Sequence, residues 1–430
     1  MTPNPPVLGS ADVPADLLAL AQGAARELTG RAVRAGSRVA VDPGPAGRPV
    51  DVLAWLLGAD LLGAATLVVE PGWTDRERAA VLGDARPHVV VTGAPAPTTT
   101  PVVPHGDEST RFYLPTTSGS SGRPAVLVRS RASWLRSFAA LGPLPGPVLV
   151  PGPLSSSLFL FGALHALWCG AELRVRPRLR AADAREVASL HVVPAMLADL
   201  LAELERTPGP CALRTVVCGG AHVGDGLRAR FARVLPGAEL MEYYGSAEHS
   251  LIAVRRGGPA LRPVPGVEVA VRDGELWVRS PLAFDGHLRS GAVVASGSGW
   301  STVGDRAELT DSGELVVLGR GSATISSGGR LVAAEEVESV LRGVPGVDDV
   351  LVSGTPHATL GAVVTAVVQA GSPPALRELC AAARAGLAPG KRPRRWLVTA
   401  ALPRTASGKP ARAAVAEQLA AGTFPAEPLR

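Results

Sequence analysis

The fold is decided by the stretch LRTVVCGGA at residues 213–221 and by the two segments that follow it. An apolar, β-branched run closed by glycines is typical of a strand that is buried on both faces. Residues 226–235, GLRARFARVL, have a helical pattern, and residues 239–245, ELMEYYG, begin as another extended segment. A strand, a helix and a strand in this order predict a mostly parallel sheet covered by helices, with ligands at the carboxyl ends of the strands.

The same alternation occurs elsewhere in the chain. Near the amino terminus we expect a helix at about 14–28, a strand at 38–41, a helix at about 50–62 and a strand at 66–69. Between about 261 and 318, short strands with glycine turns predict a small β-rich unit. After Gly319 we expect a helix at about 334–342, strands near 348–353 and 361–369, a helix near 375–386 and a strand at 396–399. The predicted fold class is therefore α/β.

Composition narrows the class of protein. The 430 residues are 46% apolar with a formal net charge of +5, which is typical of a folded globular chain and predicts neither a nucleic-acid partner nor a membrane partner. The opening MTPNPPVLGS has no basic residue ahead of an apolar stretch, so we expect a cytoplasmic location. The four cysteines have no paired CxxC spacing, and buried free thiols are the expected state.

Four polar segments could carry chemistry. They are Thr116-Thr117-Ser118-Gly119-Ser120-Ser121-Gly122, Cys218-Gly219-Gly220-Ala221 followed by Glu242 to Glu248, Gly299 to Asp305 followed by Gly319-Arg320, and Leu402 to Lys409. Backbone N–H groups and hydroxyls in a glycine-rich loop suit a polyanion, an aromatic ring can stack on a base, and a carboxylate can bind Mg²⁺ or ribose hydroxyls. Each segment taken alone is as consistent with an ordinary turn or a surface acid.

Rare residue types add to this pattern. Of the 43 basic residues only Lys391 and Lys409 are lysines, and Lys409 lies in the fourth polar segment. An ammonium group is a compact and mobile point charge, unlike the planar guanidinium of arginine. The only tyrosines, Tyr113, Tyr243 and Tyr244, lie in or beside the first two segments.

In this order and with these gaps, the segments resemble the motifs of the adenylate-forming superfamily, which includes acyl- and aryl-CoA ligases and stand-alone adenylation enzymes. TTSGSSGRP resembles its phosphate loop, YYGSAE its YGxTE segment, GWSTVGD its (T)GD segment, GRGSATISSGGRLVAAEEVE its hinge-and-glycine segment, and PRTASGK its catalytic-lysine segment. The resemblance covers about residues 14–420. It implies an amino-terminal adenylation domain at 1–319 and a small mobile α+β carboxyl-terminal domain at 320–430.

The resemblance also implies a role for individual residues. Residues Thr116, Thr117, Ser118, Gly119, Ser120, Ser121 and Gly122 would hold the phosphates of ATP, and Gly219, Gly220, Ala221, Tyr243, Tyr244 and Gly245 the adenine. Asp305 and Arg320 would contact the ribose, Glu248 would bind Mg²⁺, and Lys409 would be the catalytic lysine. Ser322 would form the hinge, and Ser327, Gly328 and Gly329 would border a tunnel for the thiol arm. For the acyl pocket the candidates are Phe161, His165 and His222, although a histidine on an apolar face is more often a core residue.

The implied reaction is ATP-dependent activation of a carboxylic acid to an acyl-adenylate, followed by transfer to the thiol of coenzyme A. One alternative is an enzyme that loads the phosphopantetheine of an acyl carrier protein, with the basic cluster KRPRRW at 391–396 as docking site. Departures from the family pattern at Ala247, Ala125 and Ser322 leave a second alternative, a degenerate nucleotide-binding or partner-binding protein that has lost adenylation. An aromatic or medium-sized acid is the expected substrate.

Overall fold

The computed structural model describes residues 15–44, 47–117, 124–221, 223–258, 260–295, 297, 299–320, 324–327, 330–357, 361–372, 374–387, 389–405 and 408–429. Its first sheet has the strand order β17-β16-β6-β4-β2-β1-β3, with β5 beside β6. These strands are β1 (Arg38–Asp42), β2 (Ala65–Val68), β3 (Val89–Thr92), β4 (Arg111–Tyr113), β5 (Thr116–Thr117), β6 (Ala125–Ser130), β16 (Gly286–Arg289) and β17 (Ala292–Ala295). The half containing β1 to β4 is parallel and the other half is antiparallel.

The second sheet contains the stretch that decides the fold. Its order is β13-β12-β11-β10-β9-β7-β8, parallel from β8 to β11 and antiparallel at β12 and β13. The strands are β7 (Val148–Pro151), β8 (Leu173–Arg176), β9 (Ser189–Val192), β10 (Thr215–Gly219), β11 (Glu239–Ser246), β12 (Ser250–Arg256) and β13 (Arg262–Pro263). Strand β10 is buried along its whole length because parallel strands are covered by helices on both faces.

Two smaller sheets follow. The third contains β14 (Glu268–Arg272), β15 (Glu275–Arg279), β18 (Asp305–Leu309) and β19 (Leu315–Arg320). The fourth contains β20 (Thr324–Ser327), β21 (Arg330–Ala333), β22 (Asp349–His357), β23 (Gly361–Gln369), β24 (Arg395–Thr399) and β25 (Glu427–Pro428). We propose that the chain divides at Gly319-Arg320, because β19 still pairs within the third sheet and β20 starts the fourth.

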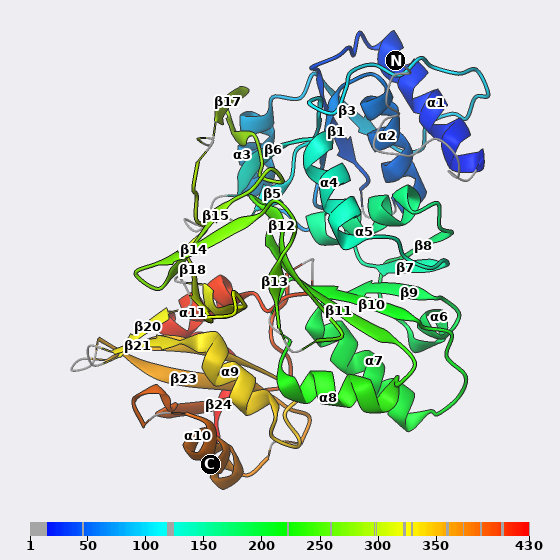
Figure 1. The fold of residues 1–430 in the computed structure, drawn as a ribbon. Coiled ribbons are helices and arrows are strands. Elements are labelled where there is room, and N and C mark those ends of the chain that lie inside the picture. Colours follow the sequence, from blue (N-terminus) through cyan, green and yellow to red (C-terminus); the bar gives the residue numbers. More distant parts are fainter. Residues whose placement is uncertain are drawn as a thin grey trace.

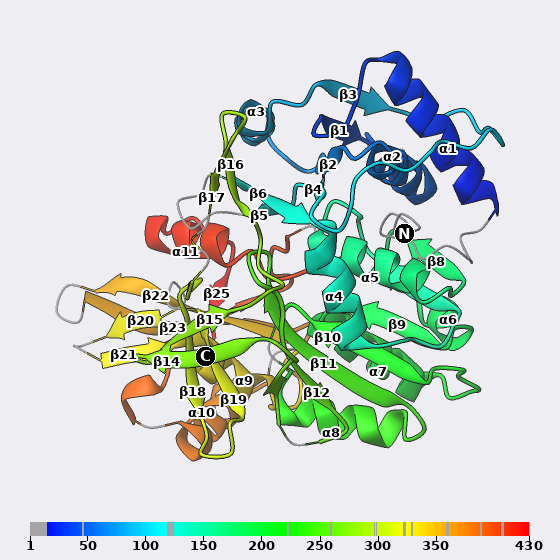
Figure 2. The same ribbon diagram turned by 45° about the horizontal axis from the view of Figure 1, so that its top comes forward.

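Helices cover the sheets in layers (Figure 1). Around the first two sheets lie α1 (Ala15–Gly30), α2 (Pro49–Leu61), α3 (Asp75–Ala85), α4 (Arg131–Leu141), α5 (Ser157–Trp168), α6 (Ala181–Arg185), α7 (Pro194–Arg206) and α8 (Asp225–Val234). Figures 1 and 2 show α4 and α5 between the two sheets, and apolar side chains of both helices and both sheets join one core. The fourth sheet is covered by α9 (Ala334–Arg342) and α10 (Leu376–Gly386) on one face and by α11 (Arg412–Ala421) on the other.

Local sequence explains several of these helices. Helix α2 begins with Pro49, whose missing N–H would have no partner in the first turn, and its middle is apolar all round because it lies inside the core. Helix α3 begins with a capping box, in which the Thr74 hydroxyl accepts from the Glu77 N–H and the Glu77 carboxylate accepts from the Thr74 N–H. These start signals fix where the chain enters each helix.

The predicted fold class is confirmed: the chain has an α/β fold with parallel-rich sheets, a small β-rich sheet and a final α+β part. One feature differs from the predicted β-rich unit at 261–318. Strands β16 and β17 lie within this range but pair with β6 of the first sheet, so the unit is tied to the amino-terminal lobe through this hairpin. No helix in the described ranges is both long enough and apolar enough to span a bilayer.

Candidate functional site

The site is built at the carboxyl ends of β10 and β11. These strands are parallel neighbours, and their register sets Gly219 opposite Tyr243. A Cβ atom on Gly219 would lie 2.3 Å from the Tyr243 ring, so only glycine fits beneath the ring. Gly220 has a φ of +85°, which side-chain-bearing residues rarely adopt. The two glycines therefore bring the backbone of this turn close to the neighbouring aromatic ring.

Lys409 reaches this strand end from the other part of the chain. A Cβ atom on Gly220 would lie 2.9 Å from Lys409 Cε, 3.3 Å from Lys409 Nζ and 2.7 Å from Leu158 Cδ1. One residue before the lysine, a Cβ on Gly408 would lie 3.5 Å from side-chain atoms of Val193 and Met196. The segment between β24 and α11 thus lies on the start of α7 and the end of β10, and the ammonium group is within reach of the predicted nucleotide site.

Asp305 and Tyr244 meet at the start of β18 in the third sheet. The Tyr244 hydroxyl donates a hydrogen bond to Asp305 Oδ2, and Asp305 is buried. Gly304 just before it has a φ of +80° and donates its N–H to Thr302 Oγ1 at 3.0 Å. The register of β18 and β19 places Asp305 directly opposite Arg320. Tyr244, which we expected at the adenine, therefore also fixes the carboxylate expected at the ribose.

Glu248 lies in a turn that is held from several sides. Its own carbonyl accepts from the Phe284 N–H at 2.7 Å. The next residue, His249, contacts Ser246 Oγ through Nδ1 at 3.2 Å and Ser301 Oγ through Nε2 at 2.8 Å. Burial lowers the pKa of His249 to about 4, so this imidazole is neutral at pH 7. The ring connects the turn of Glu248 to the segment that precedes Asp305.

Arg129 also holds this turn, through hydrogen bonds to backbone carbonyls. Its Nε and Nη2 donate to the Ala247 carbonyl at 3.1 and 2.6 Å, and its Nη1 donates to the Leu282 carbonyl at 2.8 Å. Burial lowers the Arg129 pKa to about 10, while the charges of Glu248 and Asp285 act to raise it, so the guanidinium stays protonated at neutral pH. Sequence reasoning missed both Arg129 and His249. The sequence gives one indication of the role of Arg129, since it is a single arginine after the apolar run of β6.

Two of the three residues expected at the acyl pocket, Phe161 and His165, lie in the core. Phe161 and His165 are buried on α5, and the His165 ring stacks on Phe138 with 5.4 Å between centroids. His165 Nε2 lies 2.8 Å from the Gly142 carbonyl, which can only accept, so this nitrogen carries the hydrogen. Burial lowers the His165 pKa to about 4. These contacts favour the core alternative for His165.

The start of α5 lies closer to the lysine than its second turn does. Leu158 approaches Gly220 beside Lys409, and Ser157 Oγ lies 3.2 Å from the Tyr113 hydroxyl. Tyr113 is buried, and burial raises its pKa to about 12, so the phenol is protonated. This first turn of α5 is therefore the part of the helix that faces the strand ends.

Some predicted residues lie outside the described ranges. They are Ser118, Gly119, Ser120, Ser121 and Gly122 of the phosphate loop, His222, Ser322, Gly328 and Gly329. The first two residues of the predicted phosphate loop, Thr116 and Thr117, form β5, which pairs with β6 after the loop. Ser327 lies in β20 opposite Arg330, and Figures 1 and 2 show the hairpin of β20 and β21 at the outer edge of the carboxyl-terminal part, away from β10. In this arrangement the lysine segment lies at the strand ends, and the strands β20 and β21 lie away from them.

The basic cluster at 391–396 is less available than its sequence indicates. Lys391 Nζ forms an ion pair with Glu336 at 2.6 Å. Arg392 donates to the carbonyls of Leu387 and Arg384 near the end of α10. Only Arg394 and Arg395 of the four basic residues are classed as exposed, which weakens the predicted docking patch.

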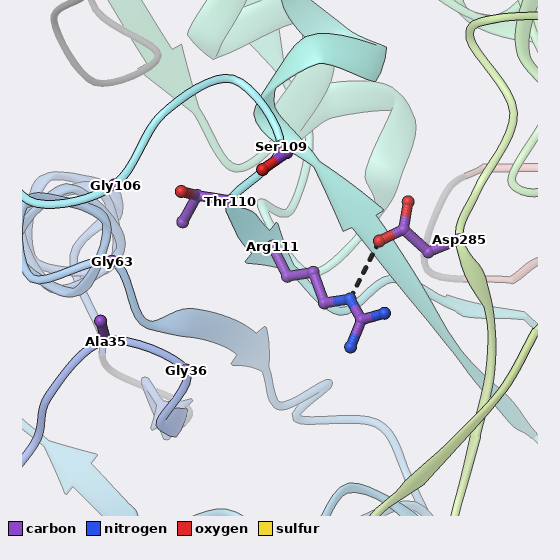
Figure 3. Close-up of a pocket in the computed structure, with 8 residues that line it drawn as sticks. All are labelled: Ala35, Gly36, Gly63, Gly106, Ser109, Thr110, Arg111 and Asp285. Carbon is purple, nitrogen blue, oxygen red and sulfur yellow. Dashed lines mark hydrogen bonds and ion pairs between the residues drawn. The ribbon is translucent and has the colours of Figure 1, made fainter. Parts of the chain in front are cut away.

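A surface hollow lies elsewhere, between the loops that lead into β1, β2 and β4 and the residue Asp285 (Figure 3). It is lined by Ala35, Gly36, Gly63, Gly106, Ser109, Thr110, Arg111 and Asp285. Arg111 and Asp285 close one side with an ion pair at 3.0 Å. None of the predicted site residues lines this hollow, and we place the functional site at the strand ends because the reactive side chains converge there.

The described residues contain no group of three or more His, Cys, Asp or Glu side chains that could hold a metal ion by themselves. Mg²⁺ that is bound together with ATP takes most of its ligands from phosphate oxygens and water, and the protein supplies one or two carboxylates. Glu248, half-buried at a strand end, is a suitable donor. The fold and the site together define a nucleotide-dependent α/β enzyme whose lysine comes from the carboxyl-terminal part.

Comparisons with known proteins agree with this class. Residues 96–288 match the model of the AMP-binding enzyme family, and residues 336–409 match that of the AMP-binding enzyme C-terminal domain. A curated relative from Bacillus subtilis (strain 168), named uncharacterized acyl–CoA ligase YhfT, is 30% identical over 346 residues, which are 74% of this chain and 70% of the relative. The long-chain-fatty-acid–CoA ligase FadD13 of Mycobacterium tuberculosis is 27% identical, with 95% of this chain and 93% of the relative covered.

A solved structure shares the fold over most of its length. The ATP-bound crystal structure of MatB from Rhodopseudomonas palustris has a TM-score of 0.83 at 21% identity, covering 95% of this chain and 94% of that one. The chain belongs to the AMP-binding enzyme family. The predicted family and the predicted class of enzyme, an AMP-forming acid–thiol ligase, are confirmed.

Proposed function

We propose that this enzyme converts a carboxylic acid and ATP to an acyl-adenylate and pyrophosphate and then transfers the acyl group to the thiol of coenzyme A. The observation that carries the proposal is the approach of Lys409 to Gly220, since it joins the two parts of the chain at one strand end. The relatives named as CoA ligases support CoA as the acceptor.

Lys409 has the central role in the first half-reaction. A carboxylate that attacks the α-phosphate of ATP is an anion approaching an anion, so charge neutralisation and alignment lower the barrier more than covalent help does. The ammonium group of Lys409 would contact both anions. The carboxylate oxygen forms a bond to the α-phosphorus, the bond from that phosphorus to the bridging oxygen breaks, and pyrophosphate leaves.

The other residues would hold the nucleotide. Asp305, oriented by the Tyr244 hydroxyl, accepts from the ribose hydroxyls, and the turn at Gly219-Gly220 lies against the adenine. Thr116, Thr117 and the loop that follows them bind the phosphates. Glu248 contributes a carboxylate to Mg²⁺, which neutralises phosphate charge when bound.

In the second half-reaction the thiol attacks the acyl carbon, the thiol proton passes to solvent, and AMP leaves. Ser327, Gly328 and Gly329 would border the path of the pantetheine arm, and Ser322 would lie at the hinge. The predicted loading of an acyl carrier protein remains the second candidate function. Its docking patch is reduced to Arg394 and Arg395, because Lys391 and Arg392 are bonded within their own domain.

The acid that this site accepts is proposed from the start of α5. Leu158 offers an apolar side chain beside Lys409, and the neighbouring Ser157 hydroxyl contacts the hydroxyl of the buried Tyr113. Such a surface suits an aromatic or medium-sized acid. A screen of carboxylic acids for pyrophosphate release tests both the activity and the substrate class.

The role of Lys409 is tested by carboxylate-dependent ATP–pyrophosphate exchange. Lys409→Ala should slow the exchange by about 100- to 1,000-fold, the usual effect of losing one charge-stabilising group, while ATP binding and the melting temperature stay near wild type. The matched control is Lys391→Ala, which removes the only other lysine and should leave exchange unchanged. Wild-type exchange in Lys409→Ala would refute the role, and ATP binding without exchange for any acid would favour the degenerate alternative.

A further inference from the structure

Backbone hydrogen bonds join the two sides of the segment that carries Lys409. The Thr405 N–H donates to the Lys409 carbonyl at 2.8 Å, and the Gly408 N–H donates to the Thr405 carbonyl at 2.9 Å. At the base of the loop the Ala411 N–H donates to the Pro403 carbonyl at 2.8 Å. Residues 403–405 and 408–411 are therefore held close together, and we call these two described stretches the lysine loop.

One side of the lysine loop is anchored through Arg404. Its Nη1 donates to the Gly408 carbonyl at 3.1 Å, and its Nη2 contacts Asp349 Oδ2 at 2.7 Å. Asp349, at the start of β22, is buried, and its Oδ1 also accepts from Arg342 Nε at 3.0 Å. A single guanidinium thus links the residue next to Lys409 to a buried carboxylate of the domain core.

The other side is anchored through Arg412, at the start of α11. Its Nη2 contacts Glu338 Oε1 at 2.6 Å, and its Nη1 donates to the Val352 carbonyl at 2.7 Å. Only 2% of the Glu338 side chain is exposed, and its Oε1 also accepts from the Val352 N–H at 2.8 Å. Arg342 contacts both Glu338 and Asp349, so the two anchors share one buried network.

We propose that Arg404 is a positioning residue for adenylation, which holds the lysine loop on Asp349 so that Lys409 enters the site as part of a rigid domain. The inference rests on the function proposed above and goes beyond it, because it assigns a role to a residue outside the site. Arginine suits this role since its planar fork contacts two acceptors at once, whereas lysine offers one point of charge.

The place of Arg404 at the boundary between the two parts agrees with this role. Gly408, whose carbonyl Arg404 holds, packs against Val193 and Met196 at the start of α7. Asp199 lies on the same helix, and partial burial raises its pKa. The positive charge of Arg404 acts to lower this pKa, which shows that Arg404 lies near α7. Arg404 therefore lies between the core of the carboxyl-terminal part and the start of α7, against which the lysine loop packs.

The test separates the two half-reactions. Acyl-adenylate formation is measured in a single turnover with ATP and the acid, and thioester formation is measured with chemically prepared acyl-adenylate and CoA. In Arg404→Met the first rate should fall about tenfold or more, since small misplacements of reacting groups cost this much, while the KM for ATP and the second rate stay unchanged. Arg404→Lys should fall between Arg404→Met and wild type.

The control is Arg377→Met, an exposed arginine on α10 of the same domain, which should match wild type in both half-reactions. Wild-type adenylation in Arg404→Met would overturn the proposal. An equal loss in both half-reactions would overturn it as well, because it would indicate general damage to the domain. If wild-type enzyme forms no acyl-adenylate, the proposed function fails, and this outcome is distinct from a failure of Arg404 alone.

Discussion

Replacing Arg129 by methionine tests how the turn of Glu248 is held. Methionine keeps an unbranched, apolar side chain in β6 but removes the three hydrogen bonds to the carbonyls of Ala247 and Leu282. A buried carbonyl that loses its donor costs about 1–3 kcal/mol. Since Leu282 is buried and Ala247 is half-buried, we expect a loss of about 2–4 kcal/mol in the free energy of unfolding, seen as a fall of a few degrees in melting temperature.

The same change should loosen Glu248, the proposed ligand of Mg²⁺. Glu248 follows Ala247 directly, and its position relative to the phosphates depends on how the Ala247 peptide is held. We expect the Mg²⁺ concentration needed for half-maximal pyrophosphate exchange to rise about tenfold, which corresponds to about 1.4 kcal/mol of lost ordering. Calorimetry gives the melting temperature, and exchange measured over a Mg²⁺ series gives the metal response.

Two further variants make the result decisive. Arg111→Met removes an exposed arginine from the neighbouring strand, where it pairs with Asp285, and should change neither quantity. Arg129→Lys keeps the charge but not the fork, and should give an intermediate response. If Arg129→Met kept the wild-type melting temperature and Mg²⁺ response, the reasoning that this arginine orders Glu248 would be refuted.

Two other predictions follow from the buried polar groups. Tyr244→Phe removes the donor to Asp305 and should raise the KM for ATP about fivefold with little change in kcat, because one hydrogen bond contributes about 1 kcal/mol; an unchanged KM would contradict the role of Tyr244. Burial lowers the pKa of His165 and His249 to about 4 and that of His191 to about 3. As the pH falls below about 6.5, these histidines are therefore protonated in the unfolded chain while they are still neutral in the folded chain. The stability that these residues contribute is complete above pH 6.5, and the free energy of unfolding should decrease by about 1.4 kcal/mol per histidine for each pH unit below it. In denaturant titrations at several pH values, His165→Gln should reduce this pH slope by about one proton, and an unchanged slope would show that His165 is protonated in the folded state.

Regular structure was predictable wherever one periodicity dominates. The expected helix at 334–342 coincides with α9, and the expected strand, helix and strand from 213 to 245 appear as β10, α8 and β11. In these stretches the hydrophobic period and the glycine boundaries indicate the same element, so tertiary contacts only reinforce the local preference. The convergence of two predicted segments at β10 and β11 was also expected, because parallel strands end at one edge.

Pairing between distant segments was not predictable in this way. The hairpin of β16 and β17 has turn residues like its neighbours, and only packing beside β6 shows to which sheet it belongs. Arg129 and Arg404 act through backbone carbonyls and a carboxylate that are remote in sequence, and such partners leave no periodic trace. For the basic cluster at 391–396, the sequence shows how many basic residues lie together but not that Lys391 forms an ion pair with Glu336.

In both parts of the chain, an arginine guanidinium holds a loop of the candidate site by bonding to that loop and to a buried acceptor. Arg129 holds the turn of Glu248 within the amino-terminal part, and Arg404 holds the lysine loop within the carboxyl-terminal part. Loops fixed in this way do not rearrange without leaving buried polar groups unpaired, which costs more than a single hydrogen bond contributes. If the two half-reactions need different segments at β10, we therefore propose that the exchange comes from rotation of one part of the chain against the other.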